Sequence, residues 1–148
     1  MADDRPPFAL TMPSDARLLP LARQFVEAVC LRHGFERAPC DAVLLAVHEA
    51  LQNVIRHAHR DRPEAPVEIQ CAVNGESIEV RLLDDGDPFD VTTVPHLDPG
   101  ELRLGGRGVF LIRRLMDEVR SEPRPVRGNV LLLVKCRGAA APDRRRLA

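Results

Sequence analysis

Residues 48–59 read HEALQNVIRHAH, and this stretch indicates a long amphipathic helix that also carries chemically active side chains. An α-helix turns by about 100° per residue, so residues three and four apart share a face. Over 39–59, apolar residues recur at that spacing and form one stripe: Val43, Val47, Ala50, Leu51, Val54 and Ala58. Glu49 and Asn53 lie four residues apart on roughly the opposite face, so their side chains reach the same space beside the helix.

Upstream of this helix, the sequence predicts a strand and then another helix. Residues 8–12 form a short β-prone run that stops at Pro13. Ser14 suits the N-cap of a helix, because its hydroxyl can accept a hydrogen bond from an amide of the first turn. We expect this helix to run to about His33, with Gly34 as its C-cap.

Downstream, the pattern changes to that of strands. Residues 67–73 alternate between apolar and polar side chains, and the dipeptide Asn74-Gly75 is typical of a tight hairpin turn. Residues 77–83 are therefore expected to return as an antiparallel strand. A segment of about twenty residues rich in Pro, Asp and Gly follows, and a loop of that length in a small domain is usually functional or disordered.

The C-terminal part predicts one more helix and two strands. The helix is expected over 108–119, because apolar residues again recur at helical spacing: Val109, Ile112, Leu115 and Met116. Strands are expected at about 119–122 and over 128–136. The Ala-, Pro- and Arg-rich residues 137–148 are expected to form a flexible tail.

The predicted order, β-α-α-β-β-loop-α-β-β, favours an α/β (α+β) fold. We expect a two-layer sandwich: a mixed, mostly antiparallel sheet with three helices on one face. The length predicts a single domain over 1–148, with its core at about 8–136. The net charge of −1 gives no reason to expect a nucleic-acid or membrane partner. The chain opens without a signal peptide, and no apolar run approaches the roughly 20 residues that span a bilayer, so we expect a cytoplasmic protein.

Two patterns that would indicate a zinc site or a disulfide framework are missing. The four cysteines are scattered, without a CxxC pair, and three of them lie in apolar runs, where reduced core cysteines are expected. The histidines of residues 48–59 flank Glu49, but Gln52 holds the position that an HExxH zinc motif gives to its second histidine.

An acidic turn follows the second strand of the hairpin. Residues 80–90 read VRLLDDGDPFD, an apolar strand that ends in carboxylates around a glycine. Asp84 at the strand end can accept a hydrogen bond from an adenine amino group, and Gly86 lets the backbone turn sharply towards a ligand. A plain acidic turn would show the same pattern, whereas a calcium loop would need the EF-hand ligand spacing, which is absent.

Glycines precede the third predicted helix. Residues 104–112 read LGGRGVFLI. Gly106 and Gly108 free the amides of the first turn to face a phosphate, which the helix dipole also favours, and Arg107 could add a charge-assisted hydrogen bond. The segment is neither a Walker loop nor the GxGxxG of a Rossmann fold.

Glu49 and Asn53 taken alone could be a solvated polar face. An Asn carbonyl is, however, a hard oxygen ligand suited to Mg²⁺, and a carboxylate beside it could orient or deprotonate a nucleophile. Together with the acidic turn and the glycine-rich helix start, these two residues indicate a site for Mg²⁺ and ATP.

The three segments, in this order and spacing, resemble the N, G1 and G2 boxes of the GHKL (histidine kinase-like) ATPase superfamily, which has the Bergerat fold. Within it, the phrases HEALQNVIRHAH, DDGDPFD and GGRGVFLIRRLMDEV resemble those of the anti-sigma-factor serine/threonine-protein kinases. The opening FALTMPSDARLLPLARQFVEAV is also similar to the first strand and helix of that family. The resemblance covers about residues 8–136.

This resemblance implies that the chain uses ATP and Mg²⁺ to phosphorylate an anti-anti-sigma (STAS-domain) protein. It also implies that the chain binds a sigma factor or another regulator and forms a homodimer. The roles it implies are Glu49 as general base, Asn53 as Mg²⁺ ligand, Asp84 with Gly86 as the adenine-recognising pair, and Gly106, Arg107 and Gly108 around the phosphates. Residues 87–105 would form an ATP lid.

One departure and two alternatives remain. Pro88 stands where many members of the superfamily have the last glycine of Asp-x-Gly-x-Gly, and its fixed φ is expected to stiffen the turn. The first alternative is a non-catalytic, ATP-responsive module that switches between partners. The second is an ATPase, in which water replaces the protein hydroxyl.

Overall fold

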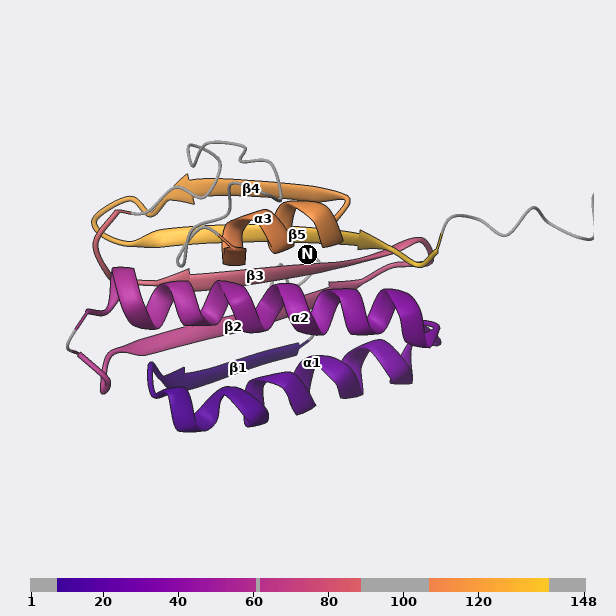
Figure 1. The fold of residues 1–148 in the computed structure, drawn as a ribbon, viewed down its shortest axis with the longest axis horizontal. Helices are drawn as coiled ribbons and strands as arrows, with labels where there is room; N and C mark the ends of the chain where they lie inside the picture. Colours follow the sequence, from indigo (N-terminus) through magenta and orange to yellow (C-terminus); the bar gives the residue numbers. More distant parts are fainter. Residues whose placement is uncertain (1–7, 61, 89–106, 139–148) are drawn as a thin grey trace, which may run out of the picture.

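The computed structural model describes residues 8–60, 62–88 and 107–138. They form two layers, a five-stranded sheet and a layer of helices that covers one of its faces (Figure 1). The strand order is β1-β2-β3-β5-β4, and every pairing is antiparallel. The strands are β1 (Phe8–Pro13), β2 (Pro66–Val73), β3 (Ser77–Asp84), β4 (Glu118–Pro123) and β5 (Asn129–Cys136).

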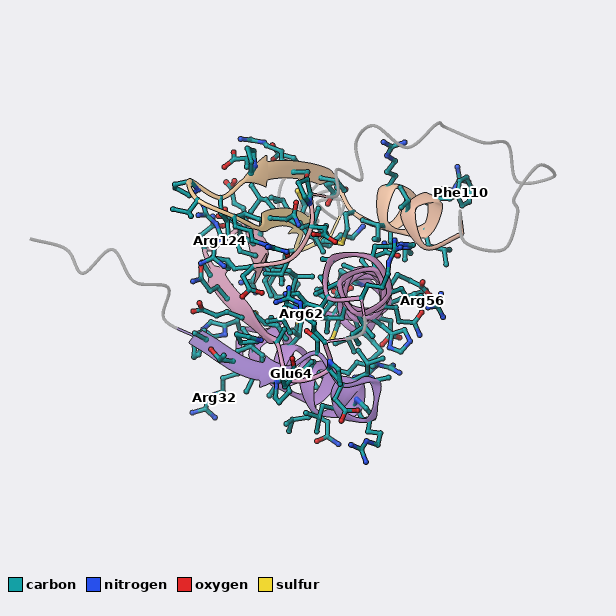
Figure 2. All side chains as sticks on the ribbon, turned by 90° about the vertical axis from the view of Figure 1, so that its left-hand side faces the viewer. Arg32, Arg56, Arg62, Glu64, Phe110 and Arg124 are labelled. Atoms are coloured by element: carbon teal, nitrogen blue, oxygen red, sulfur yellow. The ribbon has the colours of Figure 1, made fainter. Side chains whose placement is uncertain are left out.

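The predicted fold class is confirmed. Three α-helices lie on the same face of the sheet, as the view along the strands also shows (Figures 1 and 2). Two shorter helical turns, η1 and η2, precede α1 and follow α2. The helical elements are η1 (Ala16–Leu18), α1 (Leu19–Arg32), α2 (Arg37–Asn53), η2 (Val54–Ala58) and α3 (Arg107–Leu115).

The start of the first helix differs from the prediction. Ser14 is not its N-cap, because the buried hydroxyl of Ser14 is hydrogen-bonded to His59 instead. Asp15 takes the capping role for the short turn η1, where its carboxylate accepts a hydrogen bond from the Arg17 amide at 2.9 Å. The helix α1 therefore begins later, at Leu19.

The end of the first helix is as predicted. Gly34 follows the C-cap with a φ of 78°, in the left-handed region that glycine adopts without steric cost. Its amide donates to the Leu31 carbonyl, and the Phe35 amide donates to the Cys30 carbonyl at 3.0 Å. These two bonds make a Schellman motif, which turns the chain towards α2.

The long central helix changes its winding near its end. It begins at Arg37, two residues before the predicted start, and from Val54 to Ala58 it becomes π-helical. The His59 amide accordingly donates to the Val54 carbonyl, five residues back, at 2.8 Å. A π-turn inserts one residue into the winding and so redirects the side chains that follow it.

The third helix is shorter than predicted. It ends at Leu115, whose carbonyl accepts a hydrogen bond from Lys135 Nζ at 2.7 Å. The Asp117 amide then donates to the Val134 carbonyl, so the chain is already in the sheet when it reaches Val119. Pairing with β5 therefore prevails over the helical pattern at these positions.

The core lies between the helices and the sheet. Its largest fully buried apolar side chains come from α1, α2, α3 and all strands but β1 and β4: Val26, Val43, Leu44, Val47, Leu51, Val67, Ile69, Ile78, Leu82, Ile112 and Leu133. Cys30, Cys40 and Cys71 are buried there as free thiols. Burial raises the pKa of Cys30 and of Cys71 to about 12, so both stay protonated and unreactive. No helix in the described ranges has the length and apolar character needed to cross a membrane.

Candidate functional site

The polar face of α2 is covered by the start of α3 instead of facing solvent. Glu49 is half-buried, and Asn53 is buried with 9% of its surface exposed. A Cβ atom on Gly108 would lie 2.9 Å from Glu49 Oε2 and 3.6 Å from Asn53 Oδ1. Glycine at this position therefore lets the first turn of α3 approach both predicted side chains.

Asn53 carries a buried donor that the protein does not satisfy. Its Nδ2 has no hydrogen-bond partner among the residues that the structure describes. A buried polar atom without a partner costs about 1–3 kcal/mol, so such atoms usually mark the place of water, an ion or a ligand. The side-chain amide of Asn53 is therefore available to a bound group.

Asp84 ends β3 inside the protein, with only 3% of its surface exposed. Its Oδ1 accepts two hydrogen bonds, from the Gly86 amide at 2.9 Å and from Asn129 Nδ2 at 3.0 Å. Both described bonds use the same oxygen, which leaves Oδ2 to accept a hydrogen bond from a ligand. Asp84 is buried, and Oδ2 has no basic partner among the described residues. A hydrogen bond that a ligand donates to this oxygen would therefore be strong.

Asn53 and Asp84 line one small cavity, although they come from different layers. Its volume of about 20 Å³ has room for roughly one water molecule. The remaining lining is mostly apolar and comes from α2, η2, β4 and β5: Ala50, Val54, Ala58, Ser121, Asn129 and Leu131. The mixture of apolar walls, a buried carboxylate and a buried amide matches the chemistry of a flat, partly polar ring, although the described cavity is smaller than such a ring.

The loop after Asp84 packs directly on the end of η2. The Asp87 amide donates to the Ala58 carbonyl at 3.0 Å. A Cβ atom on Gly86 would lie 2.1 Å from that same carbonyl oxygen, closer than any real contact. Gly86 is therefore required here by the approach of two backbones, which gives its predicted importance a steric reason.

The turn between β4 and β5 holds the same loop from the other side. Arg124 Nη1 donates to the Asp84 carbonyl at 3.1 Å, and Arg127 Nε donates to the Asp85 carbonyl at 3.0 Å. Asn129 Nδ2 also donates to the Asp87 carbonyl, at 2.8 Å. These contacts fix the backbone that carries the buried carboxylate.

Sequence reasoning missed Asn129 and the two arginines of this turn. Asp84 and Asn129 are register partners in the antiparallel pair of β3 and β5, 45 residues apart. The pairing register of distant strands is not visible in a single sequence. The only local signal was a Gly-Asn dipeptide at 128–129 just before an apolar strand.

Several predicted residues lie outside the described part of the chain. Gly106 and residues 89–105 of the predicted lid belong to this group, and so does the side chain of Arg107, the first residue of α3. Their expected roles therefore stay predictions. Among the described residues, no group of three His, Cys, Asp or Glu side chains could hold a metal ion.

Comparison with known proteins places the chain among ATPases and kinases. Residues 12–135 match the family model of the histidine kinase-like ATPase domain. The serine-protein kinase RsbW of Listeria monocytogenes serovar 1/2a is 30% identical over 128 residues, which cover 81% of this chain and 82% of that protein. RsbW of Bacillus subtilis strain 168 is 29% identical over 119 residues, which cover 75% and 74%.

A solved structure supports the fold. The chain is similar to the crystal structure of the RsbU and RsbW domains of Rv1364c from Mycobacterium tuberculosis, with a TM-score of 0.58 and 15% identity. The similarity covers 89% of this chain and 33% of that one.

Replacing Gly86 by alanine tests the close approach of the two backbones. We expect Gly86→Ala to lower the free energy of unfolding by about 1–3 kcal/mol, because the added methyl group must displace a backbone carbonyl. Urea unfolding of both proteins measures the difference.

Gly75→Ala is the matched control, because a Cβ atom on Gly75 would meet nothing within 4 Å. It should change the stability by no more than about 0.5 kcal/mol. Equal stability of the two variants would contradict the described packing of Gly86 on Ala58.

Proposed function

The chain belongs to the histidine kinase-like ATPase domain family, and from this premise we propose that it is an ATP-dependent serine/threonine-protein kinase of the anti-sigma-factor type. One observation carries the assignment of the site: Asn53 from α2 and Asp84 from β3 line the same buried cavity. The sequence predicts that Asn53 is a ligand for Mg²⁺ and that Asp84 accepts a hydrogen bond from adenine. The relatives named as serine-protein kinases support the choice of reaction.

Asp84 would recognise the adenine ring. Its Oδ1 is held by Gly86 and Asn129, so Oδ2 would accept a hydrogen bond from the exocyclic amino group of the base. The apolar cavity walls would pack on the faces of the ring. Because the described cavity has room for only about one water, binding of the base requires the walls to separate.

The first turn of α3 would receive the phosphates. The amides of a helix start are free to donate, and the helix dipole favours an anion there. Gly108 brings this turn against Glu49 and Asn53, so phosphates bound to it would lie near both residues. Gly106 and Arg107 would extend the same contact surface.

Asn53 would hold Mg²⁺ through its carbonyl oxygen. Asn53 Oδ1 and Glu49 Oε2 both lie beside Gly108, and amide and carboxylate oxygens are the hard ligands that Mg²⁺ prefers, so the residues fit the ion. Bound Mg²⁺ would neutralise charge on the phosphates during transfer. It usually keeps several water ligands, which agrees with the few protein groups available here.

Glu49 would act as the general base. The hydroxyl oxygen of a serine or threonine on the protein substrate attacks the γ-phosphorus, and the bond from this phosphorus to the β–γ bridging oxygen breaks. ADP leaves with that electron pair. The hydroxyl proton passes to the Glu49 carboxylate, whose Oε2 lies beside the first turn of α3.

The partners follow from the resemblance of the three motifs. We propose that the substrate is an anti-anti-sigma (STAS-domain) protein and that the chain also binds a sigma factor or an equivalent regulator. A homodimer in the cytoplasm would be the working form. Phosphorylation of one partner would then change which partner the kinase holds.

Nucleotide binding tests the assignment of the cavity. We expect Asp84→Asn and Asn53→Ala each to raise the Kd of ATP in the presence of Mg²⁺ by at least about tenfold, because the first loses a hydrogen bond to a charged group and the second loses an oxygen ligand of the ion. Isothermal titration calorimetry measures this. Asp41→Asn, at an exposed carboxylate paired with Arg37 on α2, should bind like the wild type. Wild-type protein that binds no ATP would refute the proposal.

Phosphoryl transfer tests the role of Glu49. We expect Glu49→Gln to slow transfer to a STAS protein by at least about a hundredfold, while the Kd of ATP changes by less than about threefold. Glu64→Gln, at an exposed position, is the control. If the wild type binds ATP without transferring phosphate, the non-catalytic module is correct. Steady phosphate release without any protein substrate would favour the ATPase.

A further inference from the structure

Three hydrogen-bonded side chains, two of them buried, lie next to the proposed adenine site. Ser14 Oγ lies 2.6 Å from His59 Nδ1, and His59 Nε2 lies 2.6 Å from Asp85 Oδ1. His59 is 1% exposed and Ser14 is 2% exposed. Ser14 follows β1, His59 follows η2 and Asp85 follows β3, so the hydrogen bonds join three separate segments.

We propose that His59 is a positioning residue of the nucleotide site, which holds Asp84 in place through Asp85. The inference rests on the proposed function, because it assigns His59 to the same ATP site. His59 contacts the loop through Asp85 and is not part of the cavity lining.

The hydrogen bonds define the protonation of the ring. Burial raises the pKa of the Asp85 carboxyl, but the hydrogen bond and charge of His59, together with Arg62, outweigh it and lower the pKa. Asp85 is therefore a carboxylate that only accepts, so His59 Nε2 carries a proton and donates it. Nδ1 accepts from the Ser14 hydroxyl when the ring is neutral and donates to the Ser14 oxygen when the ring is charged. Arg62, labelled in Figure 2, adds a second positive group 3.7 Å from the same carboxylate.

His59 acts on the loop from a rigid base. Its amide closes the π-turn on Val54, and Ser14 is fixed because its amide donates to the Ala65 carbonyl at 2.9 Å. Ala58, the residue before His59, accepts the hydrogen bond of Asp87. The loop is thus attached at two places, one on each side of Gly86. The Asp85 side chain binds His59, which follows η2, and the Asp87 amide binds Ala58, the last residue of η2. Without the hydrogen bond between His59 and Asp85, only the attachment of the Asp87 amide to Ala58 would remain on the helical side.

A catalytic role for these three residues does not fit the geometry. Ser, His and Asp also form nucleophilic triads, in which the carboxylate binds Nδ1 and the serine binds Nε2. Here the two ring nitrogens have exchanged partners, and the buried hydroxyl of Ser14 cannot reach a substrate. The arrangement instead resembles the outer hydrogen bonds that orient the residues of binding sites.

The test compares nucleotides that differ at the group that Asp84 reads. ITP has an oxygen where ATP has the exocyclic amino group, so a displaced Asp84 should lose affinity for ATP more than for ITP. We expect Asp85→Ala, which removes the acceptor, and His59→Leu, which removes the donor, to raise the Kd of ATP by about tenfold and that of ITP by less than about threefold. His59→Gln keeps a donor for Asp85 and should recover part of the loss.

Transfer kinetics separate positioning from catalysis. The same variants should raise the KM for ATP and leave kcat within about twofold of the wild type, since Glu49 is untouched. Ser14→Ala, which breaks only the outer hydrogen bond, should show a smaller rise of about threefold. Asp15→Asn is the control, because the Asp15 carboxylate is bonded to Arg17 on the surface and, within the described residues, has no contact with the loop after β3.

Thermal unfolding shows which variants are folded. If His59→Leu does not fold, Asp85→Ala decides, because the side chain of Asp85 is 47% exposed and tolerates the change. Folded variants with the ATP and ITP affinities of the wild type, or with equal losses for both nucleotides, would overturn the role of His59 alone. A wild type that binds neither nucleotide would overturn the proposed function with it.

Discussion

The close contact between the loop at 84–87 and the end of η2 is the constraint on which the site depends. The Ala58 carbonyl accepts the Asp87 amide, and Gly86 lies against the same oxygen with no room for a Cβ atom. This contact joins the helical layer to the C-terminal end of β3, the central strand of the sheet. It places the carboxylate of Asp84 opposite the amide of Asn53, so that one helix and one strand share a single cavity.

Hydrogen bonds from the surrounding structure hold the loop in this position. The β4–β5 turn donates three hydrogen bonds to the loop backbone through Arg124, Arg127 and Asn129, and His59 holds Asp85 from the helical side. Of these groups Asn129 and His59 are buried, and buried polar groups favour one arrangement strongly, because an unpaired one would be costly.

Local chemistry made much of this predictable, and long-range geometry accounts for the rest. The apolar stripes and the Asn-Gly turn predicted the order of elements and the sandwich, and residue types at Asp84 and Gly86 indicated a ligand site. Asn129 and the contact of His59 with Asp85 are not evident from the sequence, because they bridge 45 and 26 residues; the histidine pattern points only to the zinc motif that Gln52 excludes. Ser14 was assigned to a helix cap by a sound local rule, but its hydroxyl has a buried partner instead. The π-turn before His59 is not predicted from the sequence, because the apolar residues Val54 and Ala58 also fit the spacing of a regular α-helix.

Amide hydrogen exchange of the full chain, with and without ATP and Mg²⁺, tests the central claim most directly, because it reads each segment separately. The account predicts that nucleotide slows exchange at Gly86 and Asp87 and in the first turn of α3, while the β2–β3 hairpin at 74–77 exchanges as before. Unchanged exchange in the loop and α3, or protection confined to another part of the molecule, would contradict the assignment of this cavity as the nucleotide site.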